Sequence, residues 1–455
     1  MEKYKQVIQK QRLYFSKGET KELSFRISAL EKLQKLIKTH EQDIMVALKE
    51  DLNKTEFDSY LTEIAVLIEE IKFTLKNIQK WAKPRKVKSS LSTFGSKSFI
   101  YPEPYGVTLI ISPWNYPFQL AMAPLIGSIA AGNTAIIKPS ELTPHTSALM
   151  ANLIGEYFPE EYISVVEGGI EISDRLLAEK WDYIFFTGSV PVGRIIMQAA
   201  AKHLTPVTLE LGGKSPAIVH EDAHLTHAAK RLVWGKFVNA GQTCVAPDYT
   251  YVHSNIKELF IAEVKKAIKD IYTSDPMETG NFTKIVSDKH FHRLTAFLNN
   301  GQLEYGGRTD TEKRMIEPTI LNDISWSDPI MEDEIFGPIL PILEYSDLDS
   351  IIMKIKDRPK PLALYLFTES DKVQEAVLKH ISFGGGCIND TVLHLSSPHL
   401  PFGGVGDSGM GAYHGKGSFD IFSHEKSMLK QSTKFDLPFR YPSEKALNTI
   451  KKLIK

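Results

Sequence analysis

The sequence contains very little cysteine, no long apolar run and no excess of charge of either sign. Two cysteines among 455 residues cannot build a disulfide framework, and they suit a reducing compartment such as the cytoplasm, where a thiol stays free. No apolar run approaches the ~20 residues of a membrane-spanning helix, and the polar start, Met1 to Gln6, has no signal-peptide features. With 54 basic and 55 acidic side chains, the net charge is -1, so nothing favours nucleic acid or an anionic membrane as a partner.

What is present is typical of a soluble globular protein with two or three domains. The chain is 42% hydrophobic and 24% charged, and 455 residues are too many for one ordinary core. Helical periodicity predicts one long amphipathic helix over residues 24–51 and a second helix from Tyr60 to Trp81. The stretch from Lys83 to Lys97 is polar and has no core face, so we expect a loop or an arm that packs on a neighbouring surface.

From Tyr105 onward, short apolar strands alternate with helices. Val107 to Ile111 is wholly apolar, as expected for a strand buried on both faces. The alternation continues to His203, and it starts again after Glu210 and runs to about Ile381. This pattern predicts an α/β protein with two open, largely parallel sheets, in which ligands bind beyond the carboxyl ends of the strands.

Cys244 is the first candidate for chemistry. It lies in Gly241-Gln242-Thr243-Cys244, just past a strongly patterned helix, and Glu210 lies upstream where a strand pattern meets a glycine turn. A thiol nucleophile and a carboxylate that activates water are sufficient to form and hydrolyse a thioester. Taken alone, Cys244 has a second interpretation as a small buried hydrophobic residue.

Two motifs at strand ends favour a phosphate and a ribose. In the loop with Gly188, Ser189 and Gly193, backbone N–H groups and the positive end of a helix favour a phosphate, although the loop is not the GxGxxG fingerprint. Lys138 and Glu141 follow another strand of the same sheet, within reach of a ribose or phosphate. The alternatives are a tight strand–helix turn for the loop and an ordinary solvated pair for Lys138 and Glu141.

Two aromatic-flanked motifs also precede or follow strands. In Trp114-Asn115-Tyr116-Pro117, the Asn115 amide can donate to an oxygen that becomes anionic, or the motif is only a turn. In the segment from Glu334 through Phe336 to Pro338, a carboxylate can accept two ribose hydroxyls, or the segment is only a strand-entry turn.

The histidines do not predict a metal site. His394, His399 and His414 lie in a late glycine-rich region, but the sequence has neither HExxH nor CxxC spacing. The segment from Ser443 to Lys455 is short, lysine-rich and amphipathic, which favours a surface or partner-contact helix, with membrane association as the alternative.

Together, and in this order, the motifs resemble the signature series of the aldehyde dehydrogenase superfamily over nearly the whole chain. The series is Trp114–Pro117, Lys138–Glu141, Thr187–Ser189, Glu210–Lys214, Gly241–Cys244, Glu334–Pro338 and Pro401–Val405. The short N-terminus and the stretches His203–Glu210 and Gly241–Tyr249 are similar to the class 3 branch, which includes fatty and aromatic aldehyde enzymes.

The resemblance implies a three-part subunit that uses NAD or NADP and forms a homodimer. Residues 1–80 and 100–208 would form a variant Rossmann domain for the dinucleotide, and residues 209–423 the catalytic domain. Residues 81–99 and 424–455 would form a bridging and oligomerisation arm, which explains the polar stretch without a core face. Glu141 would hold a ribose 2′-hydroxyl and repel a 2′-phosphate, although class 3 enzymes often accept both cofactors.

The same resemblance implies a role for each candidate residue. Cys244 would attack the aldehyde, Asn115 would hold the oxyanion, and Glu210 would activate the water that releases the acid. The implied cofactor contacts are Trp114, Lys138, Glu141, Gly188, Ser189, Gly193, Leu211, Glu334 and Phe336. The expected tunnel residues are Tyr116, Phe118, Trp234, Val238 and Thr243, which suit medium-chain aliphatic or aromatic aldehydes.

Three other functions remain open at the level of sequence. In a CoA-acylating aldehyde dehydrogenase, CoA replaces water as the acceptor, and Glu210 argues against this because a hydrolytic base suits water. A cofactor-independent cysteine hydrolase needs a histidine paired with Cys244, and none is adjacent in sequence. A non-catalytic binding protein on the same fold has no use for Cys244, Glu210 and Asn115 together.

Overall fold

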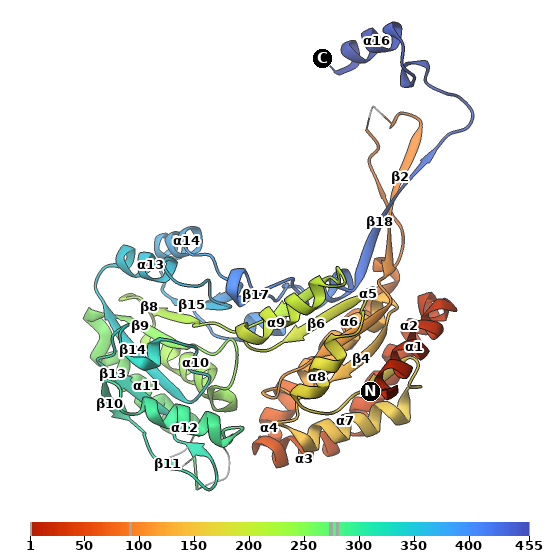
Figure 1. Ribbon diagram of the computed structural model, residues 1–455. Coiled ribbons are helices and arrows are strands. Elements are labelled where there is room, and N and C mark those ends of the chain that lie inside the picture. Colours follow the sequence, from red (N-terminus) through yellow and green to blue (C-terminus); the bar gives the residue numbers. More distant parts are fainter. Residues whose placement is uncertain (1, 91–92, 273–275, 279–281, 455) are drawn as a thin grey trace.

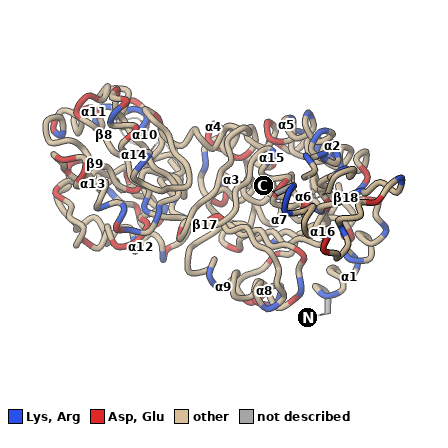
Figure 2. Tube along the Cα trace, turned by 90° about the horizontal axis from the view of Figure 1, so that it is seen from above, with Lys and Arg blue, Asp and Glu red and all other residues tan. Residues whose placement is uncertain are grey.

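The computed structural model describes residues 2–90, 93–272, 276–278 and 282–454. Two lobes, each built on one open sheet, lie next to each other, and a narrow arm extends from one of them (Figure 1). Lys and Arg alternate with Asp and Glu along the chain in both lobes, so neither lobe carries charge of one sign (Figure 2).

The first lobe begins with helices. They are α1 (Glu2–Ser16), α2 (Leu23–Thr39), α3 (Glu41–Leu52), α4 (Glu56–Ser59), a π-helical turn (Tyr60–Ala65) and α5 (Val66–Trp81). The prediction of one helix over residues 24–51 is wrong, because His40 has φ -108° and ψ 24° and separates α2 from α3. The break lets the two halves bury their apolar faces on different neighbours: α2 on α5 and α6, and α3 on α7.

The first sheet confirms the predicted parallel alternation. Its order is β17-β7-β6-β3-β4-β5, and all neighbours except β17 and β7 run parallel. The strands are β3 (Val107–Ile111), β4 (Thr134–Lys138), β5 (Ile163–Val165), β6 (Tyr183–Thr187), β7 (Val207–Glu210) and β17 (Gly409–Met410). The connecting helices are α6 (Gln119–Ala131), α7 (Pro144–Tyr157), α8 (Ile170–Leu177) and α9 (Val190–Ala201).

The second sheet has the order β10-β13-β14-β9-β8-β15-β16 and is parallel except at β10. Its strands are β8 (Pro216–Val219), β9 (Tyr249–His253), β10 (Gln302–Tyr305), β13 (Thr319–Asn322), β14 (Ile339–Tyr345), β15 (Ala363–Phe367) and β16 (Gly385–Ile388). The helices of this lobe are α10 (Leu225–Phe237), α11 (Lys257–Tyr272), α12 (Asp288–Phe297), α13 (Leu348–Lys356) and α14 (Asp371–His380). A ribbon of β11 (Thr309–Asp310) and β12 (Met315–Ile316) lies apart, and α15 (Lys416–Ile421) packs on α6 in the first lobe.

The arm is a three-stranded antiparallel sheet of β1 (Arg85–Val87), β2 (Ser96–Pro104) and β18 (Ser423–Gln431). The polar stretch without a core face therefore contains strands, and the arm sheet continues to Pro104. Helix α16 (Glu444–Ile454) lies at the far end of the arm, away from both lobes (Figure 1). Among the described residues, no helix is both long enough and apolar enough to cross a membrane.

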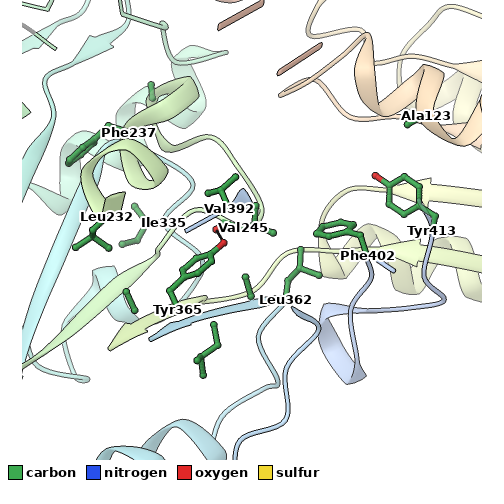
Figure 3. Close-up of a cluster of buried hydrophobic side chains, with 14 of the residues drawn as sticks. Ala123, Leu232, Phe237, Val245, Ile335, Leu362, Tyr365, Val392, Phe402 and Tyr413 are labelled. Carbon is green, nitrogen blue, oxygen red and sulfur yellow. Dashed lines mark hydrogen bonds between the residues drawn. The ribbon is translucent and has the colours of Figure 1, made fainter. Parts of the chain in front are cut away.

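One cluster of buried apolar side chains continues through both lobes. Figure 3 shows part of it, where Phe402 and Tyr413 lie beside each other and Tyr365 donates a 2.6 Å hydrogen bond to the Val245 carbonyl. The two lobes therefore share one apolar core.

Candidate active site

An apolar cavity of about 700 Å³ lies between the lobes and reaches Cys244. Helix α5 and the start of α6 form one side, and α10 with the segment 390–398 forms the other. Helix α10 lines the cavity with His227, Arg231, Trp234 and the following Val238, which lie on one helix face. The cavity is therefore mostly apolar, and its lining also includes charged side chains such as Lys230, Arg231 and Asp390.

A tight turn aims Cys244 at this cavity. Between α10 and Cys244, Asn239 and Ala240 have φ of 54° and 52°, in the left-handed region that side chains disfavour. Gly241 has φ +71°, and a Cβ there would lie 2.3 Å from the Gly337 carbonyl oxygen. Only glycine fits this close approach, so the turn fixes where the next residues point.

The environment of Cys244 keeps its thiol protonated in the free protein. Burial, followed by the charges of Glu334 and Glu210, raises the pKa of Cys244 to about 12. The backbone N–H groups of Cys244 and Val245 act in the opposite direction, because they point at the sulfur and stabilise its anion.

Glu210 ends strand β7 and has no hydrogen-bond partner for either carboxyl oxygen in the described structure. Burial raises its pKa well above the ordinary value of 4.5. Because Glu210 is close enough to raise the pKa of Cys244, the structure brings the two predicted residues into electrostatic contact. An unpartnered carboxyl of raised pKa is a suitable general base for water.

The Asn115 side chain lies in the loop between β3 and α6 and points at the cysteine loop. Its amide donates a 3.0 Å hydrogen bond to the Gln242 carbonyl, and Asn239 donates a 2.9 Å bond back to the Asn115 carbonyl. The Tyr116 and Thr243 hydroxyls lie 2.6 Å apart. Three contacts thus join the predicted oxyanion loop to the loop that carries Cys244.

The expected phosphate and ribose residues gather at the carboxyl ends of the first sheet. Lys138 is buried and forms a 2.9 Å ion pair with the half-exposed Glu141. Gly188, Ser189 and Gly193 lie at the start of α9, and a Cβ on Gly193 would lie 2.7 Å from Leu211 Cδ2.

Buried hydroxyls without a partner mark the same edge. Ser112 directly follows β3, and Thr187 is the last residue of β6. Neither hydroxyl has a hydrogen-bond partner in the described structure. Buried polar groups are normally satisfied, so two unsatisfied hydroxyls here favour a bound polar ligand.

The other expected cofactor contacts lie close to one another on the second lobe's side. Trp114 and Phe336 pack edge to face at 5.3 Å between centroids, and Phe336 has a strained φ of 51°. A Cβ on Gly212 would lie 2.1 Å from Glu334 Oε2, so glycine is required beside this carboxylate. Burial, followed by Asp248, raises the pKa of Glu334 to about 8, although part of its side chain remains exposed.

Four of the five expected tunnel residues line the cavity: Tyr116, Trp234, Val238 and Thr243. Phe118 does not line it, because its side chain is buried in the apolar core as the chain enters α6.

Sequence reasoning missed the opposite wall of the cavity. Glu70 on α5 lines it together with Phe402 and Tyr413. Glu70 accepts a 2.7 Å hydrogen bond from the Gly415 N–H, and burial raises its pKa to about 7. A signal was present, because Glu63 and Glu70 share a helix face with apolar residues such as Leu67, where a carboxylate is unexpected.

Comparison with known proteins agrees with this geometry. The model of the aldehyde dehydrogenase family matches residues 1–428. The chain belongs to the aldehyde dehydrogenase family. The predicted resemblance is thus confirmed, and the protein is an oxidoreductase that acts with NAD or NADP, the cofactors of this family.

Similar aldehyde dehydrogenases include bacterial and mammalian proteins. The chain is 50% identical over 434 residues to the 4,4'-diaponeurosporen-aldehyde dehydrogenase of Staphylococcus aureus, covering 95% of each chain. It is 45% identical over 426 residues to the dimeric NADP-preferring aldehyde dehydrogenase of Mus musculus, covering 94% of each. A solved structure, the substrate-bound state of Staphylococcus aureus AldH, superposes with a TM-score of 0.97 at 49% identity and 99% coverage of both chains.

Proposed function

We propose that the protein oxidises elongated apolar aldehydes to carboxylic acids with NAD or NADP, through a thioester on Cys244. One observation carries the proposal: the thiol borders an apolar cavity of about 700 Å³ while the unpartnered carboxyl of Glu210 lies within its electrostatic reach. A nucleophile, a base and an apolar route for the substrate thus meet at one place.

The residues at the carboxyl end of the first sheet fit a dinucleotide. The unpartnered Ser112 and Thr187 hydroxyls and the N-terminus of α9 suit phosphate oxygens. Lys138 and Glu141 would bind the adenosine ribose, and Glu334 beside Gly212 the second ribose. When bound, the oxidised nicotinamide supplies a hydride acceptor.

The chain's own residues would then act as follows. The Cys244 sulfur would release its proton to water and bond to the aldehyde carbon, and the new oxyanion would be held by backbone N–H groups and by the Asn115 amide, which has two N–H bonds. Loss of hydride from that carbon leaves the thioester. Glu210 accepts a proton from water as the water oxygen bonds to the carbonyl carbon, and it returns that proton to the sulfur as the C–S bond breaks, which gives the acid and the thiol.

The cavity supports an apolar substrate of some length. Pockets that bind drug-sized ligands have volumes of ~300–1,000 Å³, and the cavity of about 700 Å³ is lined chiefly by apolar and aromatic side chains. The Staphylococcus aureus relative is named for 4,4'-diaponeurosporen-aldehyde. We therefore propose aliphatic or aromatic aldehydes of medium or greater length.

The arm and α16 are proposed as the dimer contact. The arm sheet leaves Met428 and Leu429 about half exposed, and the mouse relative is named dimeric. Light scattering of the whole chain should give twice the mass of one subunit of 51.2 kDa. A measured mass of one subunit would contradict this assignment without affecting the proposed chemistry.

The test of the chemistry combines an aldehyde panel with the Glu210→Gln variant. The wild type should produce reduced nicotinamide and free acid, and more efficiently as the alkyl chain lengthens. Glu210→Gln should give one rapid equivalent of reduced cofactor per subunit and then a steady state slower by about 10²–10⁴-fold, the usual contribution of a general base.

Mass spectrometry of the stalled variant should find the acyl group on Cys244. Cys387→Ser is the matched control and should behave like the wild type, because Cys387 lies on β16 outside the cavity lining. A full steady state in Glu210→Gln would reassign the base. Formation of acyl-CoA without free acid, when CoA is present, would show that the acceptor is CoA.

A further inference from the structure

A buried ion pair lies behind the oxyanion loop. Lys54 and Glu63 form this pair with both side chains completely buried, and burial lowers the pKa of Lys54 while Glu63 opposes the shift. Lys54 follows α3, and Glu63 lies in the π-helical turn before α5. Single π-helical turns inside helices are frequently found at functional sites.

Glu63 holds the backbone of the loop. Its Oε2 accepts hydrogen bonds of 3.0 Å from the Phe118 N–H and 2.9 Å from the Gln119 N–H, where α6 begins. Negative charge is favourable at a helix N-terminus, and bonds from N–H to carboxylate are stronger than neutral ones. The carboxylate thereby fixes the position at which the chain leaves the loop.

Lys54 contacts a side chain of the same loop, that of Tyr116, the residue after Asn115. Its Nζ lies 4.1 Å from the centroid of the Tyr116 ring, and the Tyr116 hydroxyl lies 2.6 Å from Thr243 Oγ1. A buried cation over an aromatic face restrains the ring. A chain of contacts therefore leads from Glu63 through Lys54 and Tyr116 to the residue next to Cys244.

Stability alone does not account for this arrangement. A buried ion pair is often no more stabilising than apolar residues of the same volume, because both charges lose their hydration. The two charges instead restrain the chain directly after Asn115: Glu63 accepts from two backbone N–H groups, and Lys54 lies over the Tyr116 ring. The loop is thus held from the first lobe by the pair and from the second by Gln242 and Asn239.

We propose that Lys54 and Glu63 are positioning residues, which hold Asn115 and Tyr116 in register with Cys244 so that the oxyanion of the substrate meets its donors. The inference rests on the proposed function, because it assumes that the loop holds the oxyanion formed when Cys244 adds to the aldehyde. Its test therefore starts from the wild type, whose activity checks the proposed function separately.

The test is the double variant Lys54→Met/Glu63→Gln, which removes both charges and keeps side-chain volume and the hydrogen-bond acceptor for α6. We expect the rate of the first turnover to fall by about 10- to 100-fold, the effect of a small misplacement of reacting groups, with little change in KM. In an Asn115→Ala background the same double variant should have almost no further effect, because residues acting through one group are not additive. If the pair had only a structural role, its removal would not lower the first-turnover rate while sparing KM. Its effect would then also be the same with and without the Asn115 side chain.

The matched control is Lys265→Met/Glu304→Gln, which removes an ion pair of 2.6 Å between α11 and β10, away from the cavity lining. It should leave the first turnover unchanged in both backgrounds. If Lys54→Met/Glu63→Gln does not fold, as judged by thermal melting, Tyr116→Phe/Thr243→Val decides, because it removes both hydroxyls of the last link. An unchanged first-turnover rate in the folded variant overturns the inference, whereas an inactive wild type overturns the proposed function instead.

Discussion

The raised pKa of Cys244 predicts that the free protein reacts slowly with alkylating reagents. A pKa of about 12 in place of 9.0 leaves ~1,000-fold fewer thiolates at neutral pH. Thiolates of higher pKa are more nucleophilic, which offsets about 20- to 30-fold of this loss. We therefore expect Cys244 to react with iodoacetamide about 50-fold more slowly than the same peptide in the unfolded chain.

The assay is timed alkylation followed by peptide mass spectrometry, with Cys244→Ser to confirm the labelled peptide. The rate should increase steadily with pH and show no plateau below about pH 10, since a plateau marks the pKa of the thiol. Glu334→Gln should accelerate the alkylation above pH 8, where Glu334 is ionised. The Glu334 carboxylate is the second-largest cause of the raised Cys244 pKa, after burial. A plateau near neutral pH in the free protein would refute the electrostatic reasoning.

Three further predictions concern single side chains. Asn115→Ala should slow a chemistry-limited turnover by about 10²–10³-fold, the effect of removing one oxyanion donor, as measured by first-turnover kinetics. Glu141→Gln should raise the kcat/KM ratio of NADP to NAD by roughly tenfold, because it removes a negative charge beside Lys138; an unchanged ratio would place the 2′-position elsewhere. Glu70 has its pKa raised from 4.5 to about 7, so its contribution to stability is full below 4.5 and is lost as the pH rises through 7. The loss amounts to about 3 kcal/mol, and Glu70→Gln should remove most of it; an equal fall in the Tm of both proteins between acid and alkaline pH would contradict this.

The sheets and the positions of the candidate site residues could be predicted because each is encoded over a short stretch of sequence. Strands such as Val107–Ile111 are wholly apolar, and glycine ends helix α6 at Gly132, which has φ +97°. The motif residues follow these strands directly. Parallel topology then brings their ends to one edge, which is why Lys138 and Glu210 lie on one edge of the same sheet in the structure.

The break at His40 and the far wall of the cavity could not be predicted in this way. Residues 24–51 keep one helical periodicity across the break, and only the separate packing partners of α2 and α3 require it. Similarly, Glu70 and Tyr413 meet at the cavity only because distant segments pack together. Such contacts depend on tertiary structure that no local pattern records.

Strand β17 places a condition on how the molecule is made. Gly409 pairs with Glu210, and the Leu211 N–H donates to the Ser408 carbonyl over 3.2 Å, so a segment from late in the chain completes the sheet edge where β7 ends. A ribosome delivers that segment long after β7 has emerged. This edge of β7 therefore stays unpaired until residues 408–410 have been synthesised. A chain that ends before these residues cannot complete the sheet beside Glu210.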